Sequence, residues 1–138
     1  MMRRGPFFLA AAGLVCAGSR AMSAEPITHL EILHLSDALL TRAVLGPQAF
    51  ETHDGLHRTS ISDRASVAEG MRLVDAAGAH ASDAKPDVRW ALTFSDAAGT
   101  KRRVIYLDKF GKRAIVDGHT VSMDGAHLIA WLRARTAL

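Results

Sequence analysis

The sequence predicts an α+β fold with a mostly antiparallel sheet and two helices packed on one face of that sheet. Large apolar residues occupy every second position over 88–94, which is the period of a half-buried strand. Runs rich in β-branched residues follow at 103–108, 113–117 and 119–123. Short turn sequences separate these runs, as in antiparallel hairpins. Together they predict a meander over about 88–123, joined by N-terminal strands.

The stretch 28–45 is open to two interpretations. Thr28 and Glu31 match a capping box, which favours a helix. However, the apolar residues of this stretch spread around a helical axis and form no stripe, which a short surface helix needs. The sequence therefore favours two short strands, at about 28–35 and 39–45, and a helix stays as the alternative.

Residues suited to capping its two ends predict the first long helix. One helical turn at 47–51 and a short strand at 57–61 precede it. Asp63 or Ser66 can cap the start of the helix, and Gly78 is suited to the position just after its end. The residues expected to form its apolar stripe are Val67, Met71 and Val74.

A second long helix is predicted at the C-terminal end of the chain. Asp124 is expected to cap it. The residues expected to face the sheet are Leu128, Ile129 and Leu132. The first long helix contains a glycine, Gly70, which lowers the stability of a helix by about 1 kcal/mol relative to alanine. The presence of a glycine there predicts that the helix packs closely against the sheet at that position.

Residues 1–24 have the layout of a secretory signal peptide. Arg3 and Arg4 precede an apolar run over 7–17, and small residues follow. The run is shorter than the ~20 residues that span a bilayer, although an uncleaved anchor is the alternative. The sequence thus predicts a periplasmic or secreted protein with no stable membrane span after cleavage.

Cleavage after Ala21 or Ala24 would leave a single α+β domain at 25–138. The leader holds three of the 17 Lys and Arg residues and none of the 14 Asp and Glu residues, so the remainder is nearly neutral. This balance argues against a nucleic-acid partner. Cys16 is the only cysteine and lies in the leader, so the domain is expected to have no disulfide and to depend on its apolar core.

The charges are unevenly distributed along this domain. Residues 25–100 hold six Lys and Arg against eleven Asp and Glu, whereas residues 101–138 hold eight against three. Six cations gather at the two ends of one predicted hairpin: Lys101, Arg102, Arg103, Lys109, Lys112 and Arg113. They form a candidate docking patch for an acidic protein surface, a phospholipid head group or an anionic glycan. The alternative is a solvated face whose charges the acidic half balances.

A metal site and a hydrolase site are the alternatives to this docking patch. His53 and His57 have i, i+4 spacing and are candidate zinc or copper ligands, but Asp54-Gly55 between them favours a turn. His119 lies near two acids, Asp117 and Asp124, as a small hydrolase would require, yet Asp117-Gly118 is also a hairpin turn sequence.

The sequence favours a non-catalytic, exported binding module over both alternatives. No nucleophile elbow, zinc-protease motif or glycine-rich phosphate loop occurs in the chain. No cofactor is implied, and the expected partner is another protein, as in an inhibitor or immunity-type role. A metal-binding protein and a small hydrolase are the alternatives.

Overall fold

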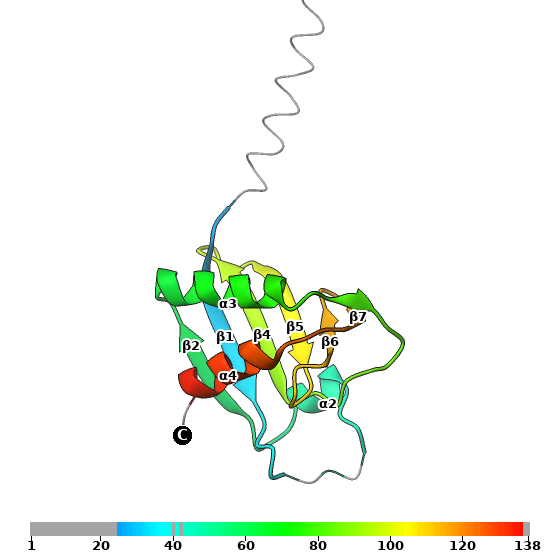
Figure 1. The fold of residues 1–138 in the computed structure, drawn as a ribbon. Helices are drawn as coiled ribbons and strands as arrows, with labels where there is room; N and C mark the ends of the chain where they lie inside the picture. The colour runs from blue at the N-terminus through cyan, green and yellow to red at the C-terminus, as the bar shows by residue number, and fades with distance from the viewer. Residues whose placement is uncertain (1–24, 40, 42, 137–138) are drawn as a thin grey trace, which may run out of the picture.

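The computed structural model describes residues 25–39, 41 and 43–136, which form one sheet and three helices (Figure 1). The strands are β1 (Ile27–His34), β2 (His57–Ile61), β3 (His80–Ala81), β4 (Trp90–Asp96), β5 (Lys101–Leu107), β6 (Arg113–Val116) and β7 (His119–Ser122). The helices are α2 (Pro47–Glu51), α3 (Arg64–Ala76) and α4 (Ala126–Arg135). The predicted signal peptide, with both of its cleavage sites, lies outside the described residues.

The seven strands lie in the order β2-β1-β4-β5-β6-β7-β3, and every neighbouring pair is antiparallel. The predicted α+β class with a mostly antiparallel sheet is therefore confirmed. Strands β4 to β7 are the predicted meander, because they are consecutive in both sequence and space. Strand β1 lies between β2 and β4, so the N-terminal strand is interior rather than at an edge.

Alternation along the central strands divides the apolar residues between the two faces of the sheet. Leu30, Trp90 and Leu92 belong to the larger buried cluster, whereas Leu33 and Ala91 belong to the smaller one. This alternation follows from strand geometry, in which successive side chains point to opposite faces.

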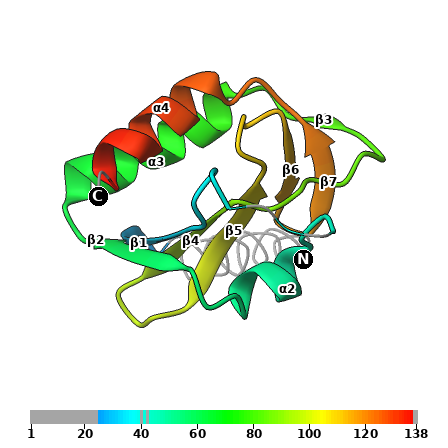
Figure 2. The ribbon, with the colours of Figure 1, turned by 90° about the horizontal axis from the view of Figure 1, so that it is seen from below.

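Helices cover both faces of the sheet. Val67 and Val74 of α3 and Leu128 and Leu132 of α4 are part of the larger cluster. Helix α2, which was expected as a single turn, places Phe50 in the smaller cluster. Figure 2 shows α3 and α4 side by side, with the sheet between them and α2. Two apolar layers therefore hold the domain together.

Helix α3 has the predicted ends and the predicted close contact at Gly70. Asp63 caps the helix by accepting a hydrogen bond from the Ser66 backbone nitrogen, and Gly78 follows its end with φ +67°. A Cβ atom at Gly70 would lie 3.1 Å from the ring of Trp131 and 3.4 Å from Leu30. The absence of a side chain at Gly70 therefore allows α3 to pack closely on Trp131 of α4 and on Leu30 of the sheet.

The second predicted N-terminal strand, at 39–45, is wrong, and so is the alternative helix across 28–45. The described residues after β1 form a turn and an irregular loop. Asp87 accepts a hydrogen bond from the Leu45 backbone nitrogen at 2.8 Å, and buried Arg89 donates to the Leu39 carbonyl at 3.2 Å. These distant side chains supply partners that a neighbouring strand would otherwise provide.

The predicted cap of α4 is also wrong. Gly125, not Asp124, occupies the N-cap position, and no side chain caps the helix there. The Gly125 backbone nitrogen donates instead to the Gly111 carbonyl at 2.9 Å. The start of α4 is thus fixed by a close backbone contact with the β5–β6 turn.

Candidate functional site

The six predicted docking residues lie at opposite ends of β5. Lys101, Arg102 and Arg103 begin the strand, whereas Lys109, Lys112 and Arg113 belong to the turn after it and the start of β6. Strand β5 has seven residues, so its two ends lie roughly 20 Å apart at about 3.3 Å per residue. The predicted patch is therefore two groups of cations.

Arginines at the start of β5 are engaged within the domain. Arg102 lies 3.4 Å from the buried carboxylate of Asp96. Arg103 forms ion pairs with Asp75 of α3 at 3.0 Å and with Asp117 at 3.2 Å. At this end Asp75 and Asp96 of the acidic half pair with the two arginines, as the alternative interpretation expected, whereas Lys101 forms no salt bridge with any described residue.

Cations of the β5–β6 turn have a different environment. Lys109, Lys112 and Arg113 are exposed, and none of them forms a salt bridge with any described residue. Phe110 is 60% exposed, and the Lys109 ammonium lies 5.0 Å from the centre of its ring. We call Lys109, Phe110, Lys112 and Arg113 the basic turn. It combines an exposed aromatic ring with three cations.

Hydrogen bonds to the Asp108 carboxylate hold the basic turn in one conformation. The Asp108 carboxylate accepts from the backbone nitrogens of Phe110 at 3.2 Å and Lys112 at 3.0 Å. Gly111 has φ +70° and packs so tightly on Gly125 that an added Cβ would lie 2.8 Å from the Gly125 carbonyl oxygen. The exposed ring and cations are therefore presented on a rigid support.

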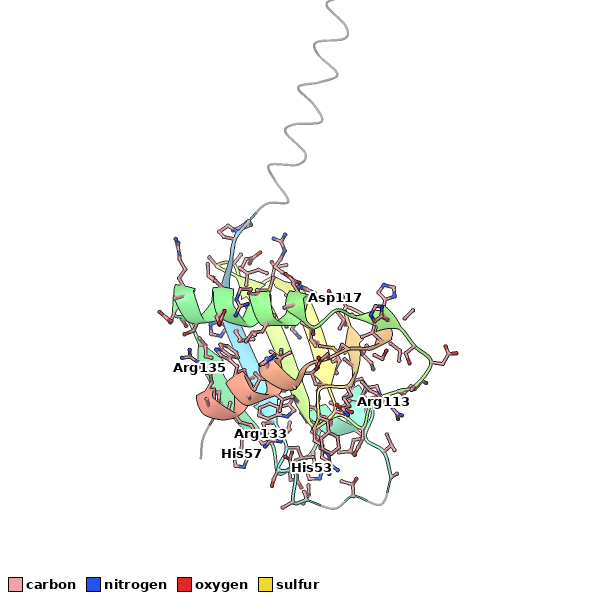
Figure 3. The ribbon with its side chains drawn as sticks, viewed as in Figure 1. His53, His57, Arg113, Asp117, Arg133 and Arg135 are labelled. Atoms are coloured by element: carbon pink, nitrogen blue, oxygen red, sulfur yellow. The ribbon has the colours of Figure 1, made fainter. Side chains whose placement is uncertain are left out.

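The two histidines of the metal hypothesis lie near one end of the sheet (Figure 3). His53 Nδ1 accepts a hydrogen bond from the Gly55 backbone nitrogen at 3.0 Å, which closes the turn that Asp54-Gly55 suggested. His57 begins β2 and pairs with His34 of β1. The described part of the chain contains no group of three or more His, Cys, Asp or Glu side chains arranged to hold a metal ion.

Asp117, one of the two acids of the hydrolase hypothesis, accepts hydrogen bonds from other residues of the domain. Asp117 Oδ1 accepts from the Val104 backbone nitrogen at 2.9 Å, and Oδ2 accepts from Arg103. Asp117 and Gly118 have φ 49° and 88°, which are the positive values of a type I′ turn. His119 is exposed on β7. The Asp-Gly pair thus shapes a hairpin.

Sequence reasoning missed a polar cluster at the end of β1. His34 Nε2 lies 3.8 Å from Asp37 Oδ1, and Arg133 of α4 donates to the other oxygen of Asp37. The imidazole of His34 stacks on the indole of Trp90. Asp37 and Arg133 are 96 positions apart, so no local pattern signals their contact.

Burial controls the protonation of this cluster. The His34 side chain is only 13% exposed, and neither ring nitrogen has a hydrogen-bond partner among the described residues. Burial lowers the pKa of His34 below 6.5, and Arg133 and His57 lower it further, while Asp37 opposes the shift. The lowered pKa therefore favours the neutral form of the imidazole.

Comparisons with protein-family models, curated proteins and solved structures find no match for this chain. The fold itself defines an α+β protein whose single seven-stranded antiparallel sheet carries helices on both faces. None of the helices in the described ranges has the length and apolar character needed to cross a membrane.

Proposed function

We propose that this protein is a non-catalytic, exported binding module that docks an acidic protein surface through the basic turn. The observation that carries the proposal is the exposed ring of Phe110 among three cations that lack salt-bridge partners in the described chain. Phenylalanine and arginine are among the side chains that are enriched at protein–protein interfaces relative to the rest of the surface. An inhibitor or immunity-type role fits such a surface.

The rigidity of the turn supports a docking role. Fixing the backbone of one flexible residue costs about 1–2 kcal/mol. Asp108 and the Gly111–Gly125 contact fix the backbone of the basic turn before any partner arrives. More of the contact energy is then available for affinity.

Charge supports the choice of an acidic partner. The three cations would accelerate association with a negative surface, and salt would weaken the effect because the Debye length is about 10 Å at 0.1 M. Arg102 and Arg103 contribute less to this attraction, because carboxylates of the same domain already neutralise them.

Site-specific photocrosslinking in the source cells tests the proposal. Phe110 is replaced by p-benzoylphenylalanine, and the matched control carries the same residue at exposed Ala134 of α4. We expect one acidic protein to be crosslinked from position 110 and not from position 134. The combined variant Lys109→Glu, Lys112→Glu and Arg113→Glu should abolish the adduct, because it reverses all three unpaired cations.

A charge control separates docking from net charge. Lys85 is exposed and forms no salt bridge with described residues, so Lys85→Glu is the matched control for the single reversal Lys112→Glu and changes net charge by the same two units without touching the basic turn. The adduct should survive this change. An adduct that also survives charge reversal of the basic turn, or that forms equally from position 134, would contradict the proposal.

Export is part of the proposal and has its own test. The basic start, apolar run and small residues of 1–24 support it. The protein recovered from the periplasm or medium should begin at Met22 or Glu25, as mass spectrometry of the intact chain would show. Recovery of uncleaved chain from the membrane fraction would favour an anchor instead.

A further inference from the structure

A pocket of about 560 Å³ opens between the start of β1 and α3, where β1 begins beside that helix (Figure 1). This volume falls within the range of about 300–1,000 Å³ that is typical of small-molecule sites. Ile27 of β1 and Val67 and Met71 of α3 give the pocket an apolar wall. An aliphatic chain is the kind of group that such a wall would shield from water.

Polar groups also line the pocket. They belong to Thr28, Ser62 and Arg64, and Arg64 forms no salt bridge with any described residue. The Ser62 hydroxyl lies 3.3 Å from His29 Nδ1. A second depression of about 460 Å³ shares Thr28 and Ser62 with this pocket and is also lined by His29 and Asp96.

We propose that this pocket binds a linear aliphatic carboxylate, with its chain on Ile27, Val67 and Met71 and its head group at Arg64 and the hydroxyls of Thr28 and Ser62. The choice of ligand follows from the apolar and polar residues that line the pocket. The apolar residues would shield the methylene groups of the ligand from water. A guanidinium and two hydroxyls are donors suited to a carboxylate. The site is separate from the basic turn.

Isothermal titration calorimetry with decanoate, below its micelle concentration, tests the proposal on protein purified after expression of the full chain. Exposed Ala68 of α3 also lines the pocket, so Ala68→Trp should fill it and weaken binding at least tenfold. Arg64→Gln should weaken binding of decanoate several-fold but leave binding of decanol unchanged, because only decanoate carries a charge. Lys85→Gln is the matched control for loss of one cation and should bind like the wild type.

Chain length supplies a second test. Acetate has the same head group and no chain, so it should not bind measurably. Thermal melting of each variant in the absence of ligand confirms that it is folded, and Ala68 and Arg64 are both exposed, so little loss of stability is expected. Wild-type affinity for decanoate in Ala68→Trp, or an equal loss for decanoate and decanol in Arg64→Gln, would overturn the proposal.

Discussion

The imidazole of His34 lies almost flat against the indole of Trp90, with ring centroids 3.8 Å apart and planes inclined by 15°. These residues face each other across β1 and β4 as a register pair. Asp37, Arg133 and His57 are the charged or titratable groups around the imidazole. The stack therefore places a titratable ring where α4 meets the loop after β1.

Folding should depend on pH through His34. Because burial lowers its pKa in the folded state, the unfolded chain binds more protons than the folded chain just below pH 6.5. The contribution of neutral His34 to the free energy of unfolding is therefore fully present above pH 6.5, and it falls as the pH drops through 6.5 towards the lower folded pKa. Urea unfolding at pH 7.5 and 5.5 should show that His34→Phe loses less unfolding free energy between the two pH values than the wild type does. The phenylalanine keeps an aromatic stack but cannot titrate. An equal loss in both proteins would contradict this assignment.

Titration of Tyr106 provides a second test. Burial, followed by its hydrogen bond to Glu51, raises the pKa of Tyr106 to about 12. The chain contains one tyrosine, so ultraviolet absorbance of phenolate reports this group alone. The midpoint should lie near 12 in the folded protein, near 10 in urea, and between the two in Glu51→Gln, because burial remains. A folded-state midpoint of 10 would show that the phenol is solvated.

The rigid support of the basic turn predicts unequal effects at two glycines. Gly118 has φ +88° and open space around it, so Gly118→Ala should cost about 1–2 kcal/mol of unfolding free energy for its backbone conformation. Gly111→Ala carries the same penalty plus a contact at 2.8 Å with the Gly125 carbonyl oxygen, so it should cost about 1–3 kcal/mol more. Denaturant unfolding measures both variants. Equal costs would mean that the Gly111–Gly125 contact relaxes freely.

Asp96 should be important for stability. Its buried carboxylate accepts from the backbone nitrogens of Ala98 and Thr100, both at 3.0 Å, and lies near Arg102. Asp96→Ala leaves these donors without that acceptor and should cost about 2–3 kcal/mol in chemical unfolding. Exposed Asp83→Ala is the control and should change stability by less than about 0.5 kcal/mol. Similar costs for both would contradict the role given to Asp96.

Local patterns explain why the predictions of the meander strands and their turns succeeded, whereas the predicted strand at 39–45 was wrong. Apolar residues at every second position predicted β4, because a strand alternates its side chains between two faces whatever its neighbours are. Asp63 and Gly78 predicted the ends of α3, and Asp117-Gly118 predicted a hairpin turn. Each of these signals acts over a few residues and depends on backbone geometry.

The sequence by itself determined the strands of the meander, the ends of α3 and the antiparallel α+β class. The reason is that backbone sterics and the alternation of apolar and polar side chains depend on residues that are close in sequence. Only the tertiary structure decided which cations are paired, where the loop after β1 is anchored, and that Asp37 meets Arg133 96 positions away. The physical reason is that ion pairs, burial and pKa shifts depend on distances between residues remote in sequence. The order of strands in the sheet sets those distances.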